Sequence, residues 1–197
     1  GNAKDQAKIV WSEAKKIVNK SPELKKRIRT LVGEMVCDAN DSIFKPLASS
    51  VDTLDGKNIS GCFMDEIHSW KQGMDLYHIM VDGTSAREQP FTLITSTAGF
   101  VREDIYDRKY EEAEKLINGY TDGTNKNDRL ICFIYELDKR EEWENPDCWK
   151  KANPSLPNVK KISTLAEKVE LAKANPLLLK DLLTKEFNIR ETSQESW

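Results

Sequence analysis

Residues 59–68 read ISGCFMDEIH, a short apolar run that ends in two adjacent carboxylates, Asp65 and Glu66. A run of this length is typical of a buried strand. In an open α/β sheet, the loops at the carboxyl ends of the strands diverge and leave a crevice in which ligands bind. Two acids at the end of such a strand therefore predict a ligand site. The other interpretation is that they are strand-end charges or favourable charges at a helix N-terminus.

A second apolar run, residues 91–95, leads directly into the sequence TSTAG. If this run is a strand of the same sheet, it brings the hydroxyl groups of Thr95, Ser96 and Thr97 to the edge where the acids lie. Hydroxyl groups in that position can hydrogen-bond a terminal phosphate, although an ordinary turn or helix cap also uses them. The combined order of strand, Asp-Glu, helix, strand and Thr-Ser-Thr favours an ATPase more strongly than either motif does alone.

Helix and strand patterns alternate along the chain and predict an α/β fold. Apolar residues at helical spacing predict helices over residues 3–20, 22–32, 70–83, 103–118, 162–175 and 177–187. Short strands joined by turns are expected within residues 34–58, and residues 129–136, RLICFIYE, are a further strand candidate. Strands separated by helices indicate a three-layer, mostly parallel sheet with helices on both faces. The Trp-, Asn- and Pro-rich residues 141–157 indicate an irregular connection.

The bulk composition sets broad limits. The 197 residues fit one globular domain, and 30 basic against 33 acidic side chains leave a net charge of −3, which demands no polyanionic partner. The four cysteines are not arranged in the close pairs of metal sites and indicate a reducing cytosol. No apolar run approaches the roughly 18 residues of a membrane span, and no leader opens the chain, so we expect a soluble protein without membrane partners.

An ordered series of segments resembles the large subunit of the tailed-phage terminase, the DNA-packaging motor. These segments are GNAKDQAKIVWSEAKKIV, FKPLASS, LDGKNISGCFMDEIH, GTSAREQPFTLITSTAGF and WKKANPSLP. The resemblance implies a P-loop NTPase-like ATPase domain followed by an RNase H-like nuclease. It implies that residues 1–138 are the central part of the ATPase domain. Residues 139–197 would be an irregular lid or linker segment and the C-terminal helices of that domain.

The resemblance also implies roles for the motif residues. Asp65 would be the Mg²⁺-binding acid of the Walker B strand and Glu66 the catalytic carboxylate, while the coupling motif that links hydrolysis to DNA movement would be Thr95, Ser96 and Thr97. Arg87 occupies a position typical of the family, and three roles stay open for it: sensing phosphate, acting between subunits, and packing. For the intact motor, the resemblance implies Mg²⁺ and ATP as cofactors. It implies double-stranded DNA, the portal protein and the terminase small subunit as partners, and the host-cell cytoplasm as the location.

The chain departs from the family at the phosphate-binding loop. That loop needs a glycine, four spacers and then Gly-Lys-Ser/Thr, so that backbone amides can surround the phosphates. The Gly56-Lys57 pair is followed by Asn58 and has Val51 where the first glycine is required. In the family this loop precedes the first helix found here, and the nuclease acids would follow Trp197. We therefore expect an excerpt of the motor that alone hydrolyses ATP negligibly, and an unpaired sheet edge that favours a homo-oligomer.

Two other functions remain open from the sequence. A non-hydrolysing module could keep the sheet as a docking surface for the small subunit or the portal. A superfamily-2 helicase core also carries the D-E-x-H tetrad formed here by Asp65 to His68, although no arginine-rich helicase motif follows. We expect His68 to be structural or solvent-facing and His78 not to bind a metal.

Two further groups of residues have both a functional and a structural interpretation. Trp143, Trp149 and the Asn153-Pro154 pair either position a lid or linker or anchor an irregular loop to the core. The basic cluster of residues 25–29 either contacts DNA phosphates or is simply a solvated helix face.

Overall fold

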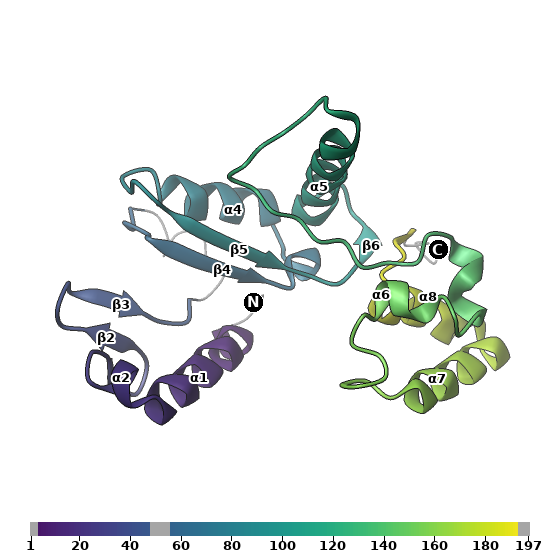
Figure 1. Cartoon of the computed structure of the whole chain (residues 1–197), viewed down its shortest axis with the longest axis horizontal. Coiled ribbons are helices and arrows are strands. Elements are labelled where there is room, and N and C mark those ends of the chain that lie inside the picture. The colour runs from purple at the N-terminus through teal and green to yellow at the C-terminus, as the bar shows by residue number, and fades with distance from the viewer. Residues whose placement is uncertain (1–3, 48–55, 193–197) are drawn as a thin grey trace. The chain divides into compact units, whose positions relative to one another are not determined.

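The computed structural model describes residues 4–47 and 56–192, and it divides into two compact units that meet in the sequence between Thr95 and Ser96. The first unit begins with helices α1 (Lys4–Lys20) and α2 (Pro22–Lys25) and the antiparallel sheet β1 (Arg29–Thr30), β2 (Met35–Cys37) and β3 (Ser42–Phe44) (Figure 1). Trp11 and Val18 of α1 are buried together with Met35 of β2, so the helix packs on this small sheet.

The second predicted helix is shorter than the sequence suggested. It ends at Lys25 instead of Val32, because Arg29 and Thr30 pair as β1 with Val36 and Met35 of β2. The Arg29 guanidinium donates two hydrogen bonds to the Asp38 carboxylate, at 2.5 and 2.6 Å. Tertiary pairing here overrides a helical pattern. Arg29 of the basic cluster is therefore engaged within the chain.

A strand–helix–strand unit completes the first unit and carries the site. Strand β4 (Gly61–Asp65) is followed by the 3₁₀ turn η1 (Ile67–Ser69) and helix α4 (Gly73–Asp82), and β5 (Phe91–Thr95) then pairs with β4 in parallel. Cys62 and Met64 of β4 are buried, as are Leu76 and Met80 of α4, which runs along the pair in Figure 1. This confirms the α/β class and the parallel pairing of the two strands that carry the motifs.

The second unit is mostly helical. It contains β6 (Phe100–Val101), α5 (Ile105–Asp122), η2 (Arg140–Glu144), α6 (Trp149–Ala152), α7 (Ile162–Ala174), α8 (Pro176–Glu186) and β7 (Glu191–Thr192), and β6 pairs with β7 in parallel. Helix α5 runs four residues beyond its predicted end and stops before Gly123, whose φ of 79° is left-handed. None of the helices among the described residues is long and apolar enough to span a membrane.

The tryptophans of the irregular segment belong to the core of this unit. Trp143 and Trp149 are buried, and the Trp149 indole donates a hydrogen bond of 2.8 Å to the Trp143 carbonyl. Asn153 donates to the Glu186 carbonyl at 2.8 Å and so ties the segment to the end of α8. The structure therefore supports the anchoring interpretation of these residues.

The predicted strand over residues 129–136 is wrong in one respect. The segment is extended but forms no strand ladder with any described residue. Side chains and single backbone bonds hold it instead: Tyr110 donates to Glu136 at 2.5 Å, Asn188 donates to the Tyr135 carbonyl at 2.8 Å, and the Leu137 N–H donates to the Phe187 carbonyl. Burial raises the pKa of Glu136. The apolar run predicted a strand but contains no information on its pairing partner.

Phe187 offers a test of this core. Its side chain is fully buried, with its ring centroid 6.1 Å from that of Trp149. We expect Phe187→Ala to lower the free energy of unfolding by about 3–5 kcal/mol, because it removes a large buried side chain and leaves a cavity. Denaturant unfolding followed by tryptophan fluorescence measures this. Leu177→Ala, at a side chain that is 85% exposed, is the control and should change stability by less than about 0.5 kcal/mol.

Candidate active site

The predicted acids lie at the carboxyl end of the parallel strand pair. Asp65 is the last residue of β4 and is paired in register with Thr95, the last residue of β5. The Thr95 hydroxyl donates to Asp65 Oδ1 at 2.7 Å, and the Glu66 N–H donates to the Thr95 carbonyl at 2.8 Å. Asp65, Glu66 and Thr95 therefore come together as the sequence predicted.

Glu66 has a backbone conformation that non-glycine residues rarely adopt. Its φ of 54° and ψ of 46° are left-handed, and it caps the turn η1. Such a conformation costs of order 1 kcal/mol or more and persists only where the surroundings enforce it. Here the Ser69 N–H and hydroxyl both donate to the Glu66 carbonyl, at 3.0 and 2.8 Å. Strained residues of this kind cluster at functional sites, which supports a functional interpretation of Glu66.

Trp70 fixes the backbone on the other side of the acids. Its side chain is buried, and its indole N–H donates to the Asp65 carbonyl at 3.0 Å. Ile67, between the acids and Trp70, is also buried. The loop that carries the two carboxylates is thus held by hydrogen bonds and by apolar packing, so that the carboxylates start from a fixed backbone.

His68 lies beside the second acid, which sequence reasoning did not predict. Its Nδ1 is 3.4 Å from Glu66 Oε2, within ion-pair distance if the ring is protonated. The sequence contained no signal for this contact, because the left-handed backbone of Glu66 and the turn after it bring positions 66 and 68 together.

Ser96 and Thr97 follow Thr95 directly but belong to the second unit. The Ser96 hydroxyl donates to the Thr97 carbonyl at 3.0 Å, and the next residue, Ala98, donates its N–H to Asn188 Oδ1. The predicted coupling motif therefore runs across the junction of the two units. The Thr95 hydroxyl of this motif contacts an acid of the site through its hydrogen bond to Asp65.

Arg87 lies at the other end of the strands. Its guanidinium donates to the Asn58 carbonyl at 3.3 Å. Asn58 precedes β4 and Arg87 precedes β5, and because the strands are parallel, both residues lie at their amino ends. Within this unit the structure does not bring Arg87 to Asp65 and Glu66.

The donor atoms suit a magnesium ion. Asp65 presents carboxylate oxygens, the ligand type that Mg²⁺ prefers, and Mg²⁺ in nucleotide sites uses one or two carboxylates with phosphates and waters. Over residues 4–47 and 56–192 there is no group of three or more His, Cys, Asp or Glu side chains that could hold a metal by itself. Asp65 thus fits an ion that is shared with a bound phosphate.

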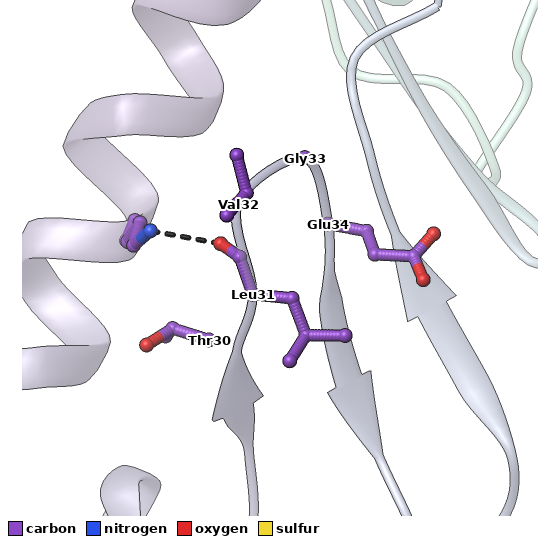
Figure 2. A pocket seen from close by; sticks show the side chains of 6 residues that line it. Thr30, Leu31, Val32, Gly33 and Glu34 are labelled. Carbon is purple, nitrogen blue, oxygen red and sulfur yellow. Dashed lines mark hydrogen bonds between the residues drawn. The ribbon is translucent and has the colours of Figure 1, made fainter.

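A surface hollow of the first unit lies elsewhere. It is formed by Lys15 of α1 and the turn between β1 and β2, residues 30–34, as Figure 2 shows. Lys15 Nζ donates to the Leu31 carbonyl at 2.8 Å, so its ammonium is used in tying the helix to the turn. None of the predicted site residues lines this hollow.

Comparisons with known proteins cover nearly the whole chain. The family model "Terminase large subunit, ATPase domain" matches residues 1–115, and "Terminase large subunit, endonuclease domain" matches residues 124–197. Protein YmfN of Escherichia coli K12 is 30% identical over 144 residues, which are 73% of this chain and 30% of that protein. The terminase large subunit of Lactococcus phage p2 is 27% identical over 154 residues, 78% of this chain and 27% of that protein.

A solved structure shows the same fold. The crystal structure of the HK97 bacteriophage large terminase matches with a TM-score of 0.76 and 22% identity, over 94% of this chain and 38% of that one. The sequence of the large subunit from Enterobacteria phage HK97 is 23% identical over 181 residues, 88% of this chain and 33% of that protein. The chain thus spans about a third or less of the length of the curated relatives it matches.

Proposed function

This chain belongs to the terminase large-subunit family, and from that premise we propose that it is part of the Mg-ATP-hydrolysing motor that packages phage DNA into a procapsid. One observation carries the proposal. Asp65, Glu66 and Thr95 meet at the carboxyl end of a parallel strand pair, where α/β proteins bind nucleotides. The helicase alternative has no support among the matched families.

The geometry supports the proposed roles. The Asp65 carboxylate takes part in holding Mg²⁺, which supplies neutralisation of the phosphate charge when it is bound. The Glu66 carboxylate, on the residue after the strand end, orients and polarises the attacking water. The strained backbone of Glu66 and its bonds to Ser69 and Thr95 keep this carboxylate in place relative to Asp65.

Thr95 is proposed to connect the acids to movement. Its hydroxyl bonds Asp65, its carbonyl accepts from Glu66, and Ser96 and Thr97 continue into the second unit. A displacement of the acids on loss of phosphate can therefore be transmitted along the backbone from Thr95 to Ser96 and Thr97. Arg87, at the opposite strand ends, is proposed to act between subunits or to pack, because it does not reach the acids of its own unit.

We propose residues 1–138 as the central part of the ATPase domain and residues 139–197 as its lid or linker and C-terminal helices. The endonuclease-domain match runs from residue 124 to residue 197, so residues 139–197 lie within it, whereas the ATPase-domain match ends at residue 115. Double-stranded DNA, the portal protein and the small subunit are the proposed partners, in the host-cell cytoplasm.

The test is ATP hydrolysis by the intact large subunit that contains this chain, measured with and without DNA and with Mg²⁺ varied. We expect hydrolysis that requires Mg²⁺ and DNA packaging that requires hydrolysis. An intact subunit that binds the portal or the small subunit but hydrolyses no ATP would contradict the proposal and favour a docking module.

Thr95→Val is predicted to reduce turnover while leaving the fold intact. The variant removes a hydroxyl that donates to a carboxylate, and such bonds contribute about 1.5–3 kcal/mol, so ATP turnover should fall roughly 10- to 100-fold. Thr95→Ser keeps the hydroxyl and should stay within about threefold of the parent. Steady-state ATPase rates of the parent, Thr95→Val and Thr95→Ser test this prediction. Equal rates for Val and Ser would mean that the hydroxyl has no role.

A further inference from the structure

The backbone bonds of the acid loop do not fix the orientation of the Glu66 side chain. The Glu66 N–H and carbonyl are both bonded, to Thr95 and Ser69. The side chain, in contrast, has three rotatable bonds and is 40% exposed. A carboxylate with this freedom loses efficiency as a base, because proton transfer needs it within hydrogen-bond reach of the water.

His68 is placed to remove that freedom. Its Nδ1 lies 3.4 Å from Glu66 Oε2, and its side chain is only 23% exposed. Its own backbone is fixed, because it is the central residue of η1 between the buried Ile67 and the turn that ends at Trp70, which is also buried. An Nδ1–H would restrain one carboxylate oxygen and leave the other to face the water. A neutral ring with its proton on Nδ1 can do this as well as a charged one.

We propose that His68 is a positioning residue that orients the Glu66 carboxylate for attack by water on ATP. This inference rests on the proposed function and goes beyond it by giving a role to a side chain outside the strand-end motifs. It is distinct from a purely structural role, in which the imidazole would only fill space beside the loop. In the positioning role, ATP turnover depends on the imidazole nitrogen nearest Glu66. In the structural role, it does not.

Three substitutions in the intact subunit separate these roles. His68→Ala removes the contact, His68→Asn keeps a nitrogen near the position of Nδ1, and His68→Gln moves the nitrogen towards the position of Nε2. We expect kcat for ATP to fall about tenfold in the Ala and Gln variants and to recover to within about threefold of the parent in the Asn variant. KM for ATP should be unchanged in all three, because orientation of the base matters only for the chemical step.

Glu66→Gln, measured in parallel, separates failure of this inference from failure of the proposed function. If Glu66→Gln retains a small measurable residual turnover and adding His68→Ala to it causes no further loss, the two residues act together as proposed. If Glu66→Gln is inactive but the Asn and Gln variants at position 68 have equal kcat, the positioning role is wrong and the proposed function stands. If the parent is inactive, or Glu66→Gln keeps turnover, both fail. Should His68→Ala not fold, the Asn and Gln pair alone decides.

Discussion

We expect Glu66→Gln to lower ATP turnover of the intact large subunit by about 10²–10⁴-fold, the usual contribution of a positioned general base. The substitution keeps the size of the side chain but replaces a carboxylate that accepts a proton with an amide that does not. It leaves the backbone bonds to Thr95 and Ser69 available, since both use main-chain atoms of Glu66. We therefore expect binding of Mg-ATP to be retained while hydrolysis is lost. Steady-state turnover and nucleotide binding, measured on the same preparation, check both parts.

Glu103→Gln is the matched control for this prediction. Glu103 is also a glutamate with a left-handed backbone, with φ of 56°, but it lies in the second unit before α5. Its backbone N–H donates to Asp107, which the substitution does not disturb. Turnover of this variant should match the parent. If Glu66→Gln kept turnover within about threefold of the parent, the base would have to be another residue.

The sequence predicted that Asp65, Glu66 and Thr95 come together, because their meeting depends on strand ends. Residues 61–65 and 91–95 form strands of equal length, and in the parallel pair their last residues lie opposite each other. Asp65 and Thr95 therefore came together without any knowledge of side-chain packing. Arg87 precedes β5 and bonds Asn58, which precedes β4, so it lies at the amino ends of the strands and apart from the acids.

The parts that could not be predicted depend on partners distant in the sequence. Arg29 lies in a strand instead of the predicted helix, because it pairs with β2 and hydrogen-bonds Asp38. The side chains of residues 129–136 alternate between exposed and partly buried, yet no described strand pairs with this segment. The approach of His68 to Glu66 required a left-handed backbone at Glu66, which carries a cost that local propensity would argue against. In each case a tertiary contact overrides the local pattern.

Asp65→Asn is the second variant with a large expected effect, because Asp65 has two proposed partners. Its carboxylate accepts the Thr95 hydroxyl at 2.7 Å and is proposed to take part in holding Mg²⁺. The amide keeps the shape and can still accept from Thr95, but it loses the charge that a hard cation requires. We expect turnover at ordinary Mg²⁺ concentrations to fall by about 100-fold or more, the scale of several kcal/mol of charge stabilisation. Asp147→Asn, at an exposed loop aspartate, should leave turnover unchanged.

A magnesium titration of these variants separates the two partners of Asp65. If the carboxylate takes part in holding the metal, Asp65→Asn shifts the Mg²⁺ concentration for half-maximal turnover upward by about tenfold or more, since one carboxylate ligand is lost. Thr95→Val, which leaves the Asp65 carboxylate in place, should lower the rate without that shift. A low rate with an unchanged magnesium midpoint in Asp65→Asn would mean that the acid serves chiefly to hold Thr95. The metal assignment would then be wrong, and the hydroxyl–carboxylate bond would be the feature on which turnover depends.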